Sequence, residues 1–100
     1  MLIKSEEIEF HLKNQDPIKI LNKFISIINR TGATVINCTH HIFPNNALSA
    51  VILIMESHAA IHTWPEDDKV WVGFFTCGDL SQIDKFKLLI KGWEIMSKED

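Results

Sequence analysis

Two long stretches of the sequence are apolar on both sides of an extended chain, and they constrain the fold more than any other feature. In "ALSAVILIME" (47–56) and "KVWVGFFTC" (69–77), apolar residues occupy odd and even positions alike. Successive side chains of a strand point to opposite faces, so such strands must be covered on both faces. Any fold for this chain therefore needs a layer on each side of its sheet.

Two helices are predicted, and both must cover the sheet. The first follows Asp16, a good N-cap residue, and ends at Gly32, which can adopt the left-handed conformation of a helix end. Its apolar residues recur every three or four positions, as in an amphipathic helix. The second is predicted to be capped by Ser81 and to end at Gly92, with "WEIM" (93–96) as a last short strand.

The order of elements predicts the architecture. Strands are expected at 7–12, 33–43, 47–56 and 69–77, and 57–64 is expected to continue extended. This order predicts an α+β fold, a two-layer sandwich with an antiparallel sheet and two helices on one face. The second face then needs a cover. A second copy of the chain would give a four-layer αββα dimer.

Length, composition and charge limit the possible functions. The 100 residues predict a single domain, 1–100, and 46% hydrophobic content favours an apolar interface with a second copy. Net charge is −3 and no cluster of Lys and Arg occurs, so nucleic acid is not an expected partner. The longest apolar run, Ala50–Met55, is too short to span a bilayer, and no signal peptide is recognisable. We expect a cytoplasmic protein whose Cys38 and Cys77 are reduced.

The segment "ESHAAIHTWPE" (56–66) concentrates reactive side chains directly after the most apolar run. His58 and His62 have the spacing of a helical zinc site, but on a strand they would lie about 13 Å apart. No metal site is therefore expected. Nucleophilic catalysis by Ser57 in a hydrolase would need a motif such as G-x-S-x-G, which the sequence lacks. Each polar residue taken alone could simply mark the end of a strand.

Taken together, these residues resemble a known family. Glu56-Ser57-His58, then Ile61-His62-Thr63-Trp64-Pro65-Glu66, and later Phe75-Thr76-Cys77-Gly78 are similar to the hallmark of the small bacterial and archaeal S-adenosylmethionine decarboxylases. The upstream "GATV" (32–35) and "LSAVILIMES" (48–57) also resemble that family. The resemblance is best over residues 32–79.

The resemblance implies a proenzyme that makes its own cofactor. Members of the family cleave themselves at the bond that here joins Glu56 and Ser57, giving a β chain, 1–56, and an α chain, 57–100. Ser57 would become a covalent pyruvoyl group that forms a Schiff base with the substrate amine and accepts electrons as CO2 leaves. By the same resemblance, His62 is the proton acceptor of processing and Ser49 positions the processing intermediate. In one regular strand Ser49 and Ser57 would share a face.

The resemblance also assigns residues to decarboxylation and to substrate binding. Cys77 matches the proton donor, although alone it would be interpreted as a buried core thiol. Glu66 matches the glutamate that holds the ribose hydroxyls. Phe43 and Trp64 could stack on the adenine or contact the sulfonium cation, with core packing as the alternative for each.

These matches predict a self-processing, pyruvoyl-dependent S-adenosylmethionine decarboxylase, which supplies the aminopropyl donor of spermidine biosynthesis and works as a homodimer of cleaved αβ protomers. Two residues depart from the family pattern, because Gly73 replaces a usual acidic residue and Trp71 is bulkier than expected. An arginine or ornithine decarboxylase on the same scaffold therefore remains an alternative. A non-catalytic homologue that activates a true decarboxylase is another.

Overall fold

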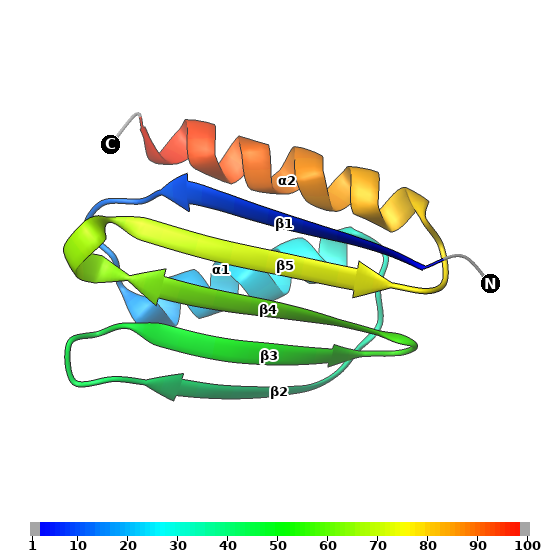
Figure 1. Ribbon diagram of the computed structural model, residues 1–100, viewed down its shortest axis with the longest axis horizontal. Coiled ribbons are helices and arrows are strands. Elements are labelled where there is room, and N and C mark those ends of the chain that lie inside the picture. The colour runs from blue at the N-terminus through cyan, green and yellow to red at the C-terminus, as the bar shows by residue number, and fades with distance from the viewer. Residues whose placement is uncertain (1–2, 99–100) are drawn as a thin grey trace.

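Five antiparallel strands form one sheet in the computed structural model, which describes residues 3–98. The strand order is β1-β5-β4-β3-β2, and both helices lie against the same face of the sheet (Figure 1). This confirms the predicted α+β fold. The elements are β1 (Lys4–His11), α1 (Pro17–Arg30), β2 (Val35–Ile42), β3 (Leu48–Ile54), β4 (Ser57–Trp64), the short 3₁₀ helix η1 (Pro65–Asp67), β5 (Lys69–Thr76) and α2 (Ser81–Ser97).

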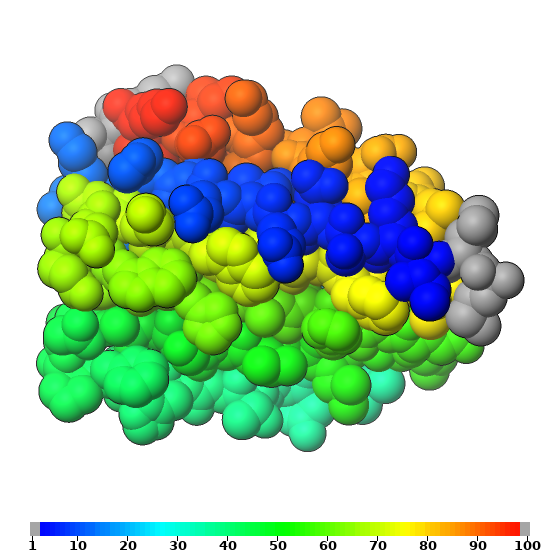
Figure 2. All heavy atoms as spheres, in the orientation of Figure 1, coloured from blue at the N-terminus to red at the C-terminus, as the bar shows by residue number. Residues whose placement is uncertain are grey.

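The hydrophobic core fills the space between the helices and the sheet. Helix α1 lies over β2 and β3, and α2 lies over β1 and β5. At the centre, the Phe86 ring packs against Phe24, with centroids 6.4 Å apart, and against Phe74 at 5.2 Å. The opposite face of the sheet, seen in Figure 2, carries no helix, and Val51 and Leu53 there are each 50% exposed. The second cover that the sequence requires is thus not supplied by residues 3–98 of one chain.

Helix α1 begins and ends as the sequence predicts. The Asp16 side chain accepts hydrogen bonds from the backbone N–H groups of Ile18 and Lys19, at 3.1 and 3.3 Å. Gly32 follows the helix with φ of +94°, a left-handed conformation that costs glycine little. The N-cap and the glycine therefore fix the length of α1.

Helix α2 begins differently from the prediction. Ser81 is its first helical residue rather than its cap. The capping carboxylate comes from Asp79, which accepts hydrogen bonds from the Ser81 hydroxyl at 2.7 Å and the Ser81 backbone N–H at 2.9 Å. These two bonds lower the pKa of Asp79 below its usual range, because they favour the ionised carboxylate.

The predicted end of α2 at Gly92 is wrong, and so is the strand expected at 93–96. The helix continues through Gly92 to Ser97. Trp93, which comes next in the apolar stripe, packs edge-on against Phe10 with ring centroids 5.1 Å apart. Gly92 itself faces open space. The tertiary contact of Trp93 outweighs the cost of about 1 kcal/mol of a mid-helix glycine. No helix within residues 3–98 has the length and apolarity needed to cross a membrane.

The segment 47–64 is a hairpin rather than one long extended run. Met55 and Glu56 form a two-residue turn, and Ile54 lies directly opposite Ser57. Glu56, the second residue of the turn, has φ of +62°, the left-handed region that glycine usually occupies at this position of a type II turn. The turn places Ser57 at the first position of β4.

Candidate active site

The cleavage cluster, comprising Glu56, Ser57, Thr76, Cys77 and Gly78, lies where the β3–β4 turn meets the end of β5. Ser57 is 9% exposed and lies opposite Thr76 in the sheet. The Ser57 hydroxyl donates to Thr76 Oγ1 at 3.0 Å, and the Gly78 backbone N–H donates to the same oxygen at 3.2 Å. Thr76, only 1% exposed, thereby fixes the position of the Ser57 hydroxyl.

The peptide bond between Glu56 and Ser57 is held from its carbonyl side as well. The Cys77 thiol donates a hydrogen bond to the backbone carbonyl oxygen of Glu56, with Sγ and O 2.8 Å apart. A donor at this oxygen polarises the carbonyl and stabilises negative charge that develops there. In addition, the left-handed backbone of Glu56 costs about 1–2 kcal/mol for a residue other than glycine. The bond is therefore both polarised and strained on its N-terminal side.

A second group of candidate residues lines a hollow of about 500 Å³ on the open face of the sheet, near its other end. This open-face pocket is lined by Phe43, Ser49, His62, Trp64 and Glu66, among others. Ser49 and His62 lie opposite each other in β3 and β4, and Ser49 Oγ is 2.9 Å from His62 Nδ1. The structure thus brings together five of the residues singled out in the sequence.

Glu66 reaches the open-face pocket from η1, just beyond the end of β4. Its Oε2 accepts a hydrogen bond of 3.1 Å from Asn45 Nδ2, and Asn45 Oδ1 in turn accepts from the Ala47 backbone N–H at 3.2 Å. Asn45 therefore holds the Glu66 carboxylate across the mouth of the pocket. Phe43 and Trp64 flank it with 42% and 39% of their surfaces exposed, so neither is packed into the core of the chain.

The two groups do not meet within one chain. Ser57 and His62 are five residues apart on β4, which separates them by about 16 Å along the strand. They also point to opposite faces, since Ser57 is buried on the helix side while His62 lines the open-face pocket. The expectation that Ser49 and Ser57 share a face is wrong for the same reason. The hairpin turn pairs Ile54 with Ser57, so Ser49 falls on the other face.

Comparison with known proteins identifies the family to which this chain belongs. Residues 11–96 match the protein family described as S-adenosylmethionine decarboxylase. The chain belongs to this family. A member from Fervidobacterium nodosum, named S-adenosylmethionine decarboxylase proenzyme, is 39% identical over 87 residues, which cover 87% of this chain and 53% of that protein.

Two further matches are also to S-adenosylmethionine decarboxylases. A proenzyme of the same name from Thermosipho africanus is 41% identical over 69 residues, covering 69% of this chain and 52% of that protein. The crystal structure of the adenosylmethionine decarboxylase from Aquifex aeolicus VF5 matches with a TM-score of 0.71 and 25% identity, over 90% of this chain and 79% of the other. The chain spans about half the length of the curated relatives it matches.

The departures from the family pattern share one place on β5. A Cβ added to Gly73 would lie 2.7 Å from Cη2 of Trp71, so the indole of Trp71 occupies the space that a side chain at 73 would need. The Trp71 ring also lies 5.6 Å from that of His62, between centroids. The two departures therefore depend on each other, because a tryptophan at 71 leaves no room for a side chain at 73.

Two residues of the site were missed by sequence reasoning. Thr76 belongs to the quoted Phe-Thr-Cys-Gly motif, but only the pairing of β4 with β5 reveals that it holds Ser57. Asn45 lies in the connection between β2 and β3 and belongs to none of the quoted motifs. Of the other reactive residues, Cys38 is partly buried, which raises the pKa of its thiol, and His58 stacks on Phe75. No group of three or more His, Cys, Asp or Glu side chains within residues 3–98 could hold a metal ion together.

Proposed function

We propose that the chain is a proenzyme that cleaves itself between Glu56 and Ser57 and then decarboxylates S-adenosylmethionine. The observation that carries the proposal is the arrangement around one peptide bond. The serine hydroxyl is held by Thr76, the carbonyl oxygen accepts a thiol hydrogen bond from Cys77, and the backbone of Glu56 is left-handed.

The cleavage proceeds by an exchange of acyl bonds. The Ser57 Oγ attacks the Glu56 carbonyl carbon, the C–N bond breaks, and an ester replaces the amide while the nitrogen takes up the proton. Loss of the Ser57 α-proton then eliminates the Glu56 carboxylate and leaves a carbon–carbon double bond at residue 57. Water finally replaces the nitrogen, ammonia leaves, and a keto group remains. The products are chains 1–56 and 57–100.

The residues at the junction fit a pyruvoyl group. After cleavage, Glu56 is free to move away, and the Cys77 thiol loses the carbonyl that it now contacts. Thr76 Oγ1 and Cys77 Sγ would then border the new terminus of the α chain. When present, the group supplies a carbonyl that condenses with an amine and accepts the electrons released with CO2. Cys77 Sγ carries the proton that must replace the lost carboxylate.

The open-face pocket is suited to the rest of the substrate. The Glu66 carboxylate, oriented by Asn45, can accept hydrogen bonds from two neighbouring ribose hydroxyls. Phe43 and Trp64 present exposed aromatic faces, which attract a sulfonium cation. S-Adenosylmethionine has both features, whereas arginine and ornithine have no ribose.

A second copy of the chain completes the site. The ends of one substrate cannot contact both groups of one chain, and His62 lies about 16 Å along the strand from the bond that it is expected to help process. The exposed apolar side chains on the open face, Val51 and Leu53, favour pairing of two sheets face to face. We infer a homodimer in which the β3–β4 turn at the end of one sheet, which carries the Glu56–Ser57 bond near Cys77, is approached by Ser49 and His62 of the other protomer.

Two variants and one substrate panel test the proposal. Wild-type protein is expected to run as two fragments, with a keto group at residue 57 that borohydride reduces, and Ser57→Ala is expected to stay in one piece without activity. Carboxyl-labelled S-adenosylmethionine, arginine and ornithine distinguish the substrates by released CO2. Mixing inactive Ser57→Ala with inactive His62→Ala under conditions of subunit exchange should restore activity. An intact wild-type chain without a trapped carbonyl contradicts the proposal.

A further inference from the structure

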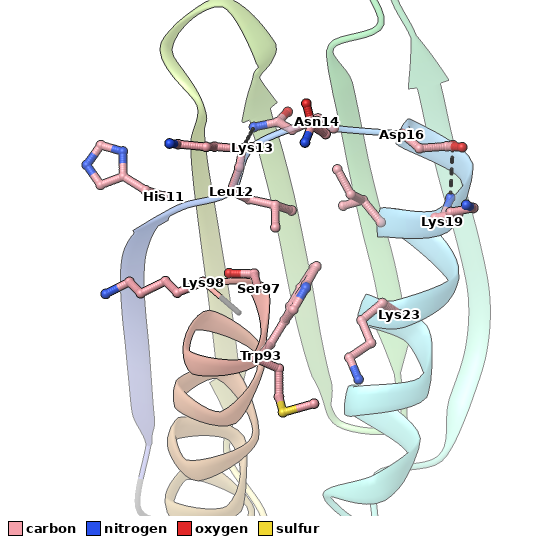
Figure 3. A pocket seen from close by; sticks show the side chains of 13 residues that line it. His11, Leu12, Lys13, Asn14, Asp16, Lys19, Lys23, Trp93, Ser97 and Lys98 are labelled. Carbon is pink, nitrogen blue, oxygen red and sulfur yellow. Dashed lines mark hydrogen bonds between the residues drawn. The ribbon is translucent and has the colours of Figure 1, made fainter. Parts of the chain in front are cut away.

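A cavity of about 680 Å³ lies away from both groups of the candidate active site. This helix-end pocket opens between the N-terminal end of α1 and the C-terminal end of α2, and the connection from β1 to α1 closes one end of it (Figure 3). It lies on the helix side of the sheet, so a dimer formed through the open face leaves it accessible. Its volume lies within the range of small-molecule sites.

The interior of the helix-end pocket is apolar. Leu12 from the connection, Ile20 from α1 and Trp93 and Met96 from α2 line it. In Figure 3 the Trp93 indole stands between the two helices and points toward Leu12. Trp93 is held in place by its edge-on contact with Phe10, at 5.1 Å between ring centroids. Ile20 and Trp93 are only 4% and 9% exposed, so Leu12 and Met96 supply most of the apolar surface that a flat or aliphatic group would meet.

The rim of the helix-end pocket is cationic, although the chain as a whole carries a net charge of −3. Four of the thirteen lining residues are lysines, and among those thirteen Asp16 is the sole acid. Its carboxylate already caps α1. Lys98 directly precedes Glu99 and Asp100, which lie outside the described residues, so the cations considered for ligand binding are Lys13, Lys19 and Lys23.

Repulsion between neighbouring lysines lowers the stability of α1. Lys19 and Lys23 are four residues apart on α1, where like charges destabilise a helix. The positive end of the α1 dipole and the negative end of the α2 dipole meet at this pocket and largely cancel, so the lysines set the sign of its potential. A bound anion would remove the repulsion between them.

We propose that the helix-end pocket binds an organic phosphate that carries a flat ring, such as a nucleotide. The ring would lie against Leu12 and Met96, beside the small exposed parts of Ile20 and Trp93, and the phosphate would lie on the lysine rim. Lysine recognises phosphate as a compact point charge and needs no fixed geometry. This proposal is independent of the reaction proposed for the cleavage cluster.

The test is a titration followed by the backbone amide and indole N–H signals of the labelled protein in NMR spectra. Guanosine diphosphate carries both parts of the ligand, guanosine only the ring, and pyrophosphate only the anion. We expect guanosine diphosphate to bind at submillimolar concentration, to shift the Trp93 indole and the amides of 12–15, and to bind at least about tenfold more tightly than either part, equivalent to about 1.4 kcal/mol.

Charge reversal distinguishes the pocket from general attraction. Lys19→Glu/Lys23→Glu is expected to weaken binding at least about tenfold. The matched control is Lys87→Glu/Lys91→Glu, which makes the same change at the same spacing on the exposed side of α2 and should alter affinity by less than about twofold. Lys13→Gln repeats the test outside α1.

Several results would overturn the proposal. One is that millimolar guanosine diphosphate shifts no signals, or shifts only those of the open-face pocket. Another is that the two double variants weaken guanosine diphosphate binding equally. A third is that pyrophosphate or guanosine binds as tightly as guanosine diphosphate. Any of these results would leave the self-cleavage proposal unaffected, because self-cleavage is read from fragment masses.

Discussion

Replacing Thr76 by valine should slow self-cleavage about tenfold. Thr76 Oγ1 accepts the hydroxyl of Ser57 at 3.0 Å and the Gly78 N–H at 3.2 Å, and valine keeps the shape while removing that oxygen. A lost hydrogen bond costs about 1 kcal/mol net. The freed hydroxyl can also populate three rotamers in place of one, which adds about 0.6 kcal/mol. Together these give roughly 1.6 kcal/mol, or a little over tenfold in rate.

The assay is a pulse of cell-free synthesis followed by a chase, with the uncut chain and the two fragments separated by mass. Thr76→Ser keeps the oxygen and should cleave within about threefold of the wild type, since it loses only a methyl group. Thr63→Val is the matched control. Thr63 is also a buried threonine of the sheet, and its Oγ1 accepts the Leu48 N–H at 2.8 Å. It therefore loses a similar bond without touching Ser57.

Cleavage of Thr76→Val at the wild-type rate, or faster, would refute this reasoning. Faster cleavage would mean that Thr76 holds the Ser57 hydroxyl in a resting position and restrains the attack. Slow cleavage shared by Thr63→Val would instead trace the effect to general destabilisation of the sheet. Only slow cleavage of Thr76→Val alone supports an orienting role.

Three further predictions concern the rest of the chain, and the two on stability use the uncut Ser57→Ala background. Cys77→Ala should cleave about fivefold more slowly, because it loses about 1 kcal/mol of hydrogen bonding to the Glu56 carbonyl. Cys77→Ser should cleave nearly normally but decarboxylate poorly. Fragment masses measure the cleavage, and released CO2 measures the decarboxylation. Gly92→Ala should stabilise α2 by about 1 kcal/mol and raise Tm by about 4–8 °C in calorimetry, because its new methyl group meets open space; an unchanged Tm would contradict this. Asp79→Ala should lower Tm at pH 7. The folded pKa of Asp79 is below its unfolded value, so its stabilising effect is present above about pH 4 and disappears as the pH falls through the folded pKa; a difference in Tm that persists in strong acid would be evidence against the cap.

Local signals in the sequence were sufficient for most of the fold. Asp16 and Gly32 bound α1 because capping depends on a few neighbouring atoms, and the double-sided apolar strands correctly indicated an uncovered sheet face. Gly92 misled because its cost of about 1 kcal/mol is small beside the burial of Trp93, a contact with a residue 83 positions earlier.

The candidate site was predictable in its residues but not in its geometry. The motif supplied Ser57, His62 and Cys77, yet the two-residue turn at Met55 and Glu56 has no strong signal such as Asn-Gly. Because 47–64 was expected to be one extended run, Ser49 and Ser57 were predicted to share a face, whereas the structure has them on opposite faces. Strand pairing was needed to find the contact between Ser57 and Thr76.

The separation of Ser57 from His62 on opposite faces of β4 bears on how the protein would mature in a cell. If the histidine must come from another molecule, a lone newly made chain is inert, and the delay before it is cut depends on how often it meets another. At low protein concentration the rate of cleavage would then rise with the square of the concentration. Once nearly all chains are paired, the fraction cleaved per unit time would no longer depend on concentration. Dilution alone would keep the precursor dormant, with no inhibitor required.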